Sequence, residues 1–208
     1  MSAVLAEMTP GFRDATHGAQ QTFRTLLDAM SRPGRVLALP PAAIDGIVPS
    51  AAMSVGTAAV LLTLLDAETT VRFGASLAGP AAEAYLRFHT GARLAAADEA
   101  AAFTAVRGAE VDAALWSGLD LGSDAAPQRG ATLIVEVDAL GGPAPTRLRL
   151  RGPGIESVQP LAVAGLSAEF WAWRTRLVAA LPRGIELILV CGTRIAAQPR
   201  TTRIEQEA

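Results

Sequence analysis

One of the two histidines lies in a segment whose residue types could do chemistry. His89 sits in residues 85–93 (YLRFHTGAR), between Arg87 and Thr90. An imidazole that titrates at about pH 7 suits acid–base work, and a neighbouring guanidinium suits anion binding. The same position also suits the end of a helix, because a partly charged histidine there interacts favourably with the helix dipole. Both interpretations stay open at this stage.

Two carboxylates, Asp66 and Glu68, are separated by one residue. On an extended segment their side chains would point the same way and could share a proton or a metal ion. In a turn after a helix they would instead accept hydrogen bonds from backbone N–H groups, and we favour the turn. Two histidines without paired cysteines do not make a zinc site, so we predict no metal.

A glycine-rich corner at residues 151–155 (RGPGI) follows a predicted strand. Gly152 and Gly154 could let backbone N–H groups approach an anion. The pattern is not a dinucleotide-binding fingerprint, and a plain tight turn explains it as well.

A second arginine segment, residues 200–203 (RTTR), brings guanidinium groups and hydroxyls together, as an anion site would. Strand alternation places Arg200 and Thr202 on one face, and Thr201 and Arg203 on the other. The alternative is an exposed edge strand protected by charge.

The chain contains no lysine, because all 18 of its Lys and Arg residues are arginine. A lysine Schiff base is therefore impossible, which excludes the pyridoxal-phosphate enzymes that work through one. The phosphate-loop pattern is excluded for the same reason. Cys191 has no assigned base, so we interpret it as structural. A stand-alone hydrolase or transferase would need a nucleophile with a base, and spacing identifies no such pair.

Composition favours one domain spanning residues 1–208, since half of the residues are hydrophobic and can form a core. A net charge of -2 gives no basic footprint for nucleic acid. The most apolar run, Ala58–Leu65, is too short to span a bilayer, and the N-terminal segment MSAVLAEMTPGFRD lacks a secretory pattern. A single cysteine fits a reducing compartment, so we expect a cytoplasmic protein that binds neither nucleic acid nor membrane.

Helices and strands alternate along the sequence, which predicts an α/β sandwich around a mixed sheet. The predicted helices are Ala19–Met30, Thr57–Leu65, Ala81–Phe88, Val111–Trp116 and Ala168–Leu181. The predicted strands are Val36–Leu39, Thr70–Phe73, Phe103–Val106, Ala131–Val137, Thr146–Arg151, Val158–Ala164, Ile185–Val190 and Thr201–Ile204. Residues 122–130 are predicted to form a loop.

Apolar spacing predicts which faces of these elements are buried. The buried face of the first helix is predicted to be Ala19, Phe23, Leu26, Leu27 and Met30. That of the last helix is predicted to be Phe170, Trp173, Leu177 and Ala180. In strand Thr146–Arg151, Leu148 and Leu150 should face inward while three arginines face solvent.

Six segments in this order resemble the PhnH family, core subunits of the bacterial carbon–phosphorus lyase system for phosphonate use. They run through nearly the whole chain: DATHGAQQTFRTLLDAMSRPG, AVLLTLLDAETTV, YLRFHTGA, GATLIVEV, LRGPGI and LPRGIELILVCGTRIAAQPRTT. The family pattern falls on Gln20, Phe23, Arg24, Met30, Pro33, Gly34, Asp66, Thr69, Arg87, Phe88, His89, Thr90, Gly152, Gly154, Ile155, Pro199, Arg200, Thr201 and Thr202. It does not require Arg32, Arg35 or Pro153.

The resemblance implies a three-layer-like sandwich similar to the fold of pyridoxal-phosphate-dependent transferases, but without that cofactor. It implies a homodimer in isolation, and in the cell an assembly with companion lyase core subunits and an ATP-binding-cassette-like subunit. That assembly makes α-D-ribose 1-methylphosphonate 5-triphosphate from ATP and an alkylphosphonate, displacing adenine. The isolated subunit is not expected to be active.

Two roles remain open for the residues that the resemblance and the motifs single out. These are Arg24, Asp66, Arg87, His89, Thr90, Gly152, Gly154, Arg200 and Thr201. In the first hypothesis Arg87, His89, Arg200 and Thr201 hold a nucleotide or phosphonate anion. In the second, the same residues stabilise a protein interface and the chain is a structural subunit.

Overall fold

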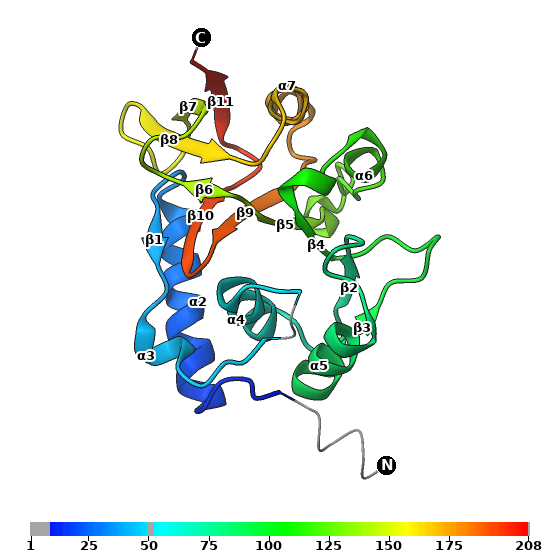
Figure 1. Cartoon of the computed structure of the whole chain (residues 1–208). Coiled ribbons are helices and arrows are strands. Elements are labelled where there is room, and N and C mark those ends of the chain that lie inside the picture. The colour runs from blue at the N-terminus through cyan, green and yellow to red at the C-terminus, as the bar shows by residue number, and fades with distance from the viewer. Residues whose placement is uncertain (1–8, 50–51, 208) are drawn as a thin grey trace.

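A seven-stranded mixed sheet forms the middle layer of the molecule (Figure 1). The computed structural model describes residues 9–49 and 52–207, so most of the segment examined for a secretory signal lies outside the described residues. The strand order is β1-β10-β9-β5-β4-β2-β3. The strands are β1 Leu37–Ala38, β2 Thr70–Phe73, β3 Arg93–Leu94, β4 Phe103–Arg107, β5 Thr132–Glu136, β9 Glu186–Cys191 and β10 Arg194–Gln198.

Five adjacent strands of this sheet, from β9 to β3, are parallel, whereas β10 runs antiparallel to both of its neighbours, β9 and β1. The β-branched run predicted as a central strand is β5, which lies between β4 and β9. Its alternate side chains reach two different cores, because Leu133 and Val135 face one side and Ile134 faces the other. A strand buried on both faces explains the nearly continuous apolar sequence.

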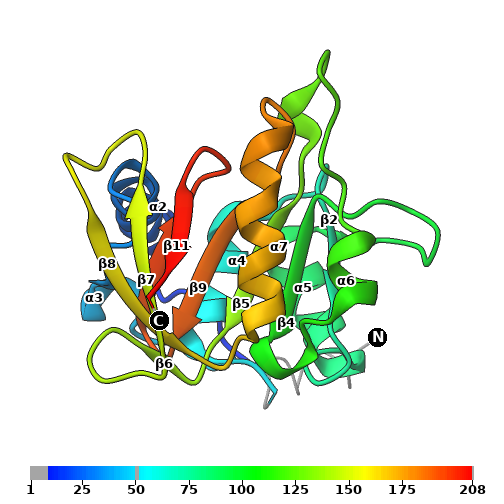
Figure 2. The same cartoon turned by 90° about the horizontal axis from the view of Figure 1, so that it is seen from above.

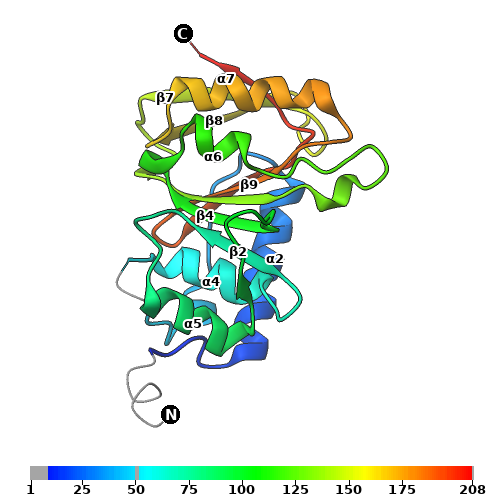
Figure 3. The same ribbon diagram turned by 90° about the vertical axis from the view of Figure 1, so that its right-hand side faces the viewer.

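Helices cover one face of the sheet, and a smaller sheet with helices covers the other (Figures 1 and 3). The first layer contains α2 Ala15–Ser31, α3 Pro41–Ile44, α4 Val55–Leu64 and α5 Pro80–Thr90. The opposite layer contains α6 Ala113–Ser117, α7 Ala168–Leu177 and a four-stranded antiparallel sheet, the second sheet, with strand order β11-β7-β8-β6. The predicted α/β sandwich around a mixed sheet is confirmed.

The second sheet consists of β6 Ala139–Leu140, β7 Thr146–Arg151, β8 Gln159–Ala164 and β11 Arg203–Gln206. Figure 2 shows α7 running beside it across the same face of the central sheet. Leu148 and Leu150 are fully buried, while Arg147, Arg149 and Arg151 are exposed. The alternation predicted for this strand is therefore confirmed, and the second sheet has one apolar and one arginine-rich face.

The buried face predicted for the first helix is wrong at two positions. Phe23 and Leu27 on α2 are 45% and 52% exposed. The buried positions are Gly18, Thr22, Leu26 and Ala29. Small residues face inward because the backbone packs closely there: a Cβ at Gly18 would lie 2.9 Å from the carbonyl oxygen of Ala43.

The predicted face of the last helix is also partly wrong. α7 ends at Leu177, followed by a 3-10 turn at Val178–Ala180. Phe170 and Leu177 are buried as expected, but Trp171 and Arg174 are buried with them, and Trp173 and Ala180 are only half-buried. Trp173 lies at the margin of the core, where its ring stacks on that of Trp116 at 5.7 Å.

Four short or alanine-rich elements had no sequence prediction: α3, β3, β6 and β10. The last predicted strand begins at Arg203 rather than Thr201, because the N–H of Thr202 donates to the carbonyl of Pro199 and closes a turn. The loop at 122–130 contains a 3-10 turn at Pro127–Arg129. Among the described residues, no helix combines the length and the apolarity needed to cross a bilayer.

Candidate functional site

The segment YLRFHTGAR forms the C-terminal end of α5. Gly91 adopts a left-handed conformation with φ 75°, and its N–H donates to the carbonyl of Arg87 at 3.0 Å. The hydroxyl of Thr90 donates to the carbonyl of Leu86 at 2.7 Å and accepts from the N–H of Ala92 at 3.1 Å. Glycine at this position and a hydroxyl on the last carbonyls are ordinary ways to end a helix. The helix-end interpretation of the segment is confirmed.

His89, near the end of α5, contacts residues 9–11, which precede α2. Its Nε2 lies 3.1 Å from the carbonyl oxygen of Thr9, and its ring makes edge contacts with Tyr85 and Phe88 at centroid distances of 4.7 and 5.0 Å. A Cβ at Gly11 would lie 3.0 Å from Nδ1 of the imidazole. In the part of the chain that the structure describes, neither imidazole ring bonds a hydroxyl, thiol or carboxylate.

Asp66 and Glu68 lie in a turn, as favoured from the sequence. Oδ1 of Asp66 accepts from the N–H of Glu68 at 3.0 Å, and the N–H of Asp66 donates to Oγ1 of Thr69 at 2.8 Å. The turn packs against the end of α5, because a Cβ at Gly91 would lie 3.2 Å from that of Ala67. Residues 9–49 and 52–207 contain no group of three or more His, Cys, Asp or Glu side chains placed to hold a metal ion.

The glycine corner at residues 152–155 is a tight turn that meets two other segments. The N–H of Ile155 donates to the carbonyl of Gly152 at 3.1 Å. Gly152 and Gly154 have φ values of 137° and 81°, which favour glycine. A Cβ at Gly152 would lie 3.1 Å from the carbonyl oxygen of Thr201, and one at Gly154 would clash with the carbonyl of Ser31. The structure thus brings Gly152 next to Thr201 and Gly154 next to Ser31 at the end of α2.

Arg200 is occupied by contacts within the chain. Its Nε pairs with Oε1 of Glu186 at 2.6 Å, and its backbone N–H donates to Oε2 of the same carboxylate at 2.9 Å. Its Nη1 donates to the carbonyls of Pro127 and Pro182. Thr202 is 1% exposed and Arg203 is exposed. Arg200 and Thr201, however, are both half-buried in the turn before β11, so the strand alternation predicted for residues 200–203 is wrong for these two residues.

The candidate residues fall into separate regions. Asp66, Arg87, His89 and Thr90 gather around the end of α5, which leads into β3, whereas Arg200 binds Glu186 at the start of β9. Strands β5, β4 and β2 lie between β9 and β3, a separation of about 19 Å at the usual strand spacing. Arg24 is exposed on α2. One anion site built from Arg87, His89, Arg200 and Thr201 together is therefore not formed.

A polar cluster at the carboxyl ends of the parallel strands has no counterpart among the sequence predictions. Arg107 ends β4 and Glu136 ends β5, with Nε 3.6 Å from Oε2. Glu136 also accepts from the N–H of Ser54, the N-cap of α4, at 2.7 Å. Open α/β sheets usually bind ligands at this edge. A charged residue at the end of each of two predicted strands was the signal in the sequence from which this cluster could have been predicted.

The same cluster extends to Glu110, whose carboxylate accepts from the hydroxyl and N–H of Ser76, both at 2.7 Å. Burial opposes a decrease in its pKa, but these hydrogen bonds and Arg107 lower the pKa of Glu110 overall. The Nη2 of Arg107 donates to the carbonyl of Ala52 at 2.8 Å. The charged groups of the cluster therefore bind one another and the ends of α4 and β2.

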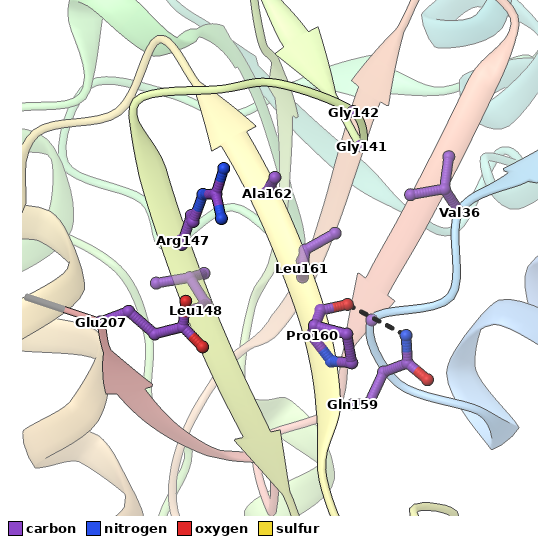
Figure 4. Close-up of a pocket in the computed structure, with 11 residues that line it drawn as sticks. Val36, Gly141, Gly142, Arg147, Leu148, Gln159, Pro160, Leu161, Ala162 and Glu207 are labelled. Atoms are coloured by element: carbon purple, nitrogen blue, oxygen red, sulfur yellow. Dashed lines mark hydrogen bonds between the residues drawn. The ribbon is translucent and has the colours of Figure 1, made fainter.

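A hollow of about 360 Å³ opens beside the second sheet (Figure 4). Arg147 and Glu207 lie on one side of it and Val36 on the other, with β8 between them. Gly34, Gly141 and Gly142 complete the rim. A second hollow, of about 410 Å³, lies at the other end of β7 around Arg151, Thr201 and Arg203.

Comparison with known proteins identifies the family. A model described as "Bacterial phosphonate metabolism protein (PhnH)" matches residues 10–205. The chain belongs to the PhnH family. The resemblance seen in six sequence segments is thus confirmed over nearly the whole length.

Two curated relatives show how far the similarity extends. The chain is 36% identical over 197 residues to the α-D-ribose 1-methylphosphonate 5-triphosphate synthase subunit PhnH of Rhizobium meliloti (strain 1021), with 94% of each chain covered. It is also 36% identical over 188 residues to the putative C-P lyase subunit protein HtxG of Stutzerimonas stutzeri, which covers 89% of this chain and 85% of that protein.

Proposed function

We propose that this chain is a subunit of the multi-protein complex that makes α-D-ribose 1-methylphosphonate 5-triphosphate from ATP and an alkylphosphonate. The observation that carries the proposal is the match to PhnH along residues 10–205, together with a relative that is named as a subunit of that synthase. The second relative is named as a C-P lyase subunit, which supports the same pathway.

The proposal includes several finer expectations. The chain acts in the cytoplasm as a single domain, forms a homodimer when isolated, and joins companion core subunits and an ATP-binding-cassette-like subunit. Its sandwich is expected to be related to the pyridoxal-phosphate transferase fold. The sequence supplies no lysine for a Schiff base, so this chain would contribute to the reaction without that cofactor.

An apolar stripe on α2 supports a role in assembly. Phe23 and Leu27 are one helical turn apart and are 45% and 52% exposed. Arg24 lies beside them and is exposed as well. Exposed aromatic and arginine side chains together are typical of the central part of protein interfaces. We propose that a companion subunit covers this α2 stripe, defined as Phe23, Arg24 and Leu27.

The experiment is co-purification of the chain with the companion subunits, followed by a synthase assay on the recovered complex. The wild type should form a stoichiometric complex that makes the product from ATP and methylphosphonate. The double variant Phe23→Ser/Leu27→Ser should lose complex formation while the isolated chain keeps its melting temperature. Val48→Ser is the matched control, because Val48 is 49% exposed but lies off α2.

Three results would revise the proposal in different ways. A wild-type chain that does not bind the companions would show that the proposed function is wrong. A double variant that assembles normally would show that the α2 stripe is not the interface. If His89→Gln assembles but loses synthesis, His89 belongs to a ligand site, whereas loss of assembly would make it an interface residue.

A further inference from the structure

On the outward face of the second sheet, the arginines of β7 face a carboxylate at some positions and another arginine at one. Strands β7 and β11 are antiparallel neighbours, with Arg149 opposite Glu205 and Arg151 opposite Arg203. At the next outward position, the N–H of Glu207 donates to the carbonyl of Arg147 at 2.9 Å. Two of the three positions thus place a carboxylate beside an arginine, and the third places two arginines together.

The arginine pair has no counter-charge in the part of the chain that the structure describes. The ion pairs among the described residues include neither Arg151 nor Arg203. Arg151 donates one hydrogen bond, from Nη1 to the carbonyl of Ser157 at 3.2 Å. Like charges directly opposite one another on a sheet are destabilising. An anion between the two guanidinium groups would remove that repulsion.

The pair borders a hollow of about 410 Å³, which is large enough for a small anion. Its lining is Arg151, Gly152, Pro153, Leu181, Thr201 and Arg203. The surface of the hollow is mostly apolar, and the donors on its border are the guanidinium groups of Arg151 and Arg203 and the hydroxyl of Thr201. The lining contains no carboxylate that would repel an anion.

The backbone of this corner is fixed from inside the protein. Nη2 of the buried Arg174 donates to the carbonyl of Pro199 at 2.7 Å, and Arg200 is paired with Glu186. On the other side, Gly152 approaches the carbonyl of Thr201 too closely for a larger residue to replace it without displacement. The backbone that carries the donors therefore needs little reorganisation, and binding has to order only the exposed arginine side chains.

We infer that the Arg151–Arg203 corner, formed by Arg151, Thr201 and Arg203, binds a phosphoryl-type anion. Phosphate, a phosphonate and the phosphate groups of a nucleotide share the tetrahedral arrangement of anionic oxygens that paired guanidinium groups recognise. The choice of ligand class deepens the proposed function, whose substrates carry these groups, but the inference rests on the geometry of the isolated chain and does not require the companion subunits.

Isothermal titration calorimetry on the full isolated chain at low ionic strength tests the inference. The probes are inorganic phosphate, methylphosphonate, ATP and, as a carboxylate, acetate. Wild type should bind phosphoryl probes and not acetate. Arg151→Gln and Arg203→Gln should each weaken binding about tenfold or more, because each removes a charge-assisted contact. The double variant should show no binding.

The matched control is Arg149→Gln, which removes an arginine from the same face but opposite Glu205. It should change affinity less than about threefold, as expected for a contribution from screened charge alone. Tighter binding of ATP than of the two smaller probes would identify a nucleotide as the source of the phosphoryl group, and equal binding would identify a free anion.

Three outcomes would overturn the inference. They are no heat of binding with any phosphoryl probe, acetate binding as well as phosphate, and an Arg149→Gln variant that loses as much affinity as Arg151→Gln. Acetate binding would indicate a site for a carboxylate side chain of another protein. Because no companion is present in the assay, its failure leaves the co-purification test of the proposed function unaffected.

Discussion

The two faces of the central sheet bury different kinds of polar side chain. Toward the helical layer the buried polar side chains are uncharged: Thr22 and Thr57 are buried on α2 and α4, and the phenol of Tyr85 donates to the carbonyl of Pro10 at 3.3 Å. Toward the second sheet the core includes Arg174, which is fully buried, and its Nε and Nη1 atoms have no hydrogen-bond partner among the described residues. The second side therefore bears the desolvation cost of a buried charge, and in return Arg174 donates to the carbonyl of Pro199 in the turn before β11.

The pKa values of these two groups shift in opposite directions. Burial raises the pKa of Tyr85 to about 12. Burial lowers the pKa of Arg174 to about 10, although the charge of Glu186 opposes the shift. In both cases the fold favours the neutral form. For the phenol that form predominates at neutral pH, whereas for the guanidinium it does not, so only Arg174 costs stability under ordinary conditions.

The largest effect is expected from the helical side. Leu61 is fully buried on α4, and Leu61→Ala should lower the free energy of unfolding by about 2–5 kcal/mol, because it removes methyl groups and leaves a cavity. Urea denaturation measures the change. Leu62→Ala is the control, since Leu62 is only half-buried on the same helix and should cost clearly less. Equal losses would contradict a tightly packed helical side.

A change of opposite sign is expected on the second side. Arg174→Met keeps side-chain length but removes the buried charge, and it should raise the free energy of unfolding by about 1–2 kcal/mol. The carbonyl of Pro199 stays satisfied, because it also accepts from the N–H of Thr202 at 2.9 Å. Leu177→Met on the same helix should lower stability by less than about 1.5 kcal/mol. A loss of stability in Arg174→Met would remove the contrast between the two sides.

The pH dependence sharpens the contrast. The folded pKa of Tyr85 exceeds its unfolded value, so its contribution is complete below pH 10 and is lost as the pH rises toward about 12. The folded pKa of Arg174 is below its unfolded value of 12.5, so its cost is complete below pH 10 and declines as the pH rises.

The Tyr85→Phe variant separates the contribution of the phenol to alkaline stability from that of Arg174. Tyr85→Phe should lose stability less steeply than wild type above pH 10, by up to about 1.4 kcal/mol per pH unit. Urea denaturation of both proteins across this alkaline range provides the test. Parallel curves for the two proteins would show that the phenol is not protected by the fold.

The smallest effect concerns the outer face of the second sheet. Arg203→Gln removes the repulsion with Arg151 and should raise stability by about 0.2–1 kcal/mol in a phosphate-free buffer of low salt. Arg149→Gln, opposite Glu205, should lower it slightly. Both changes should shrink at high salt, because exposed charges are screened. An Arg203→Gln variant that is less stable than wild type would show that the two arginines do not repel each other.

Local patterns in the sequence predicted much of the fold. The bounds of β2 and β7 match their predictions, because β-branched residues or strict alternation lie between clear turn signals. The tight turn at Gly152 and the helix end at Gly91 could likewise be anticipated from glycine alone.

The features that the sequence did not predict depend on contacts between segments that are distant in the sequence. α2 has apolar residues on two faces, and only packing against α3 and α4 shows which face is inward. Nothing in the sequence of α7 indicates that Arg174 lies beneath β11 and the turn before it. The ion pair of Arg107 with Glu136 joins neighbouring strands far apart in sequence. For the candidate site, the sequence indicated the corner at Gly152 and Thr201 but not the pairing of Arg151 with Arg203.

Both edges of the central sheet end in very short strands, since β1 and β3 contain two residues each. Each edge therefore offers few backbone groups on which another chain could extend the sheet. An assembly at either edge would therefore rest on side-chain contacts more than on shared backbone hydrogen bonds. The short edges of this sheet also limit the edge-to-edge pairing of two copies from which fibres grow.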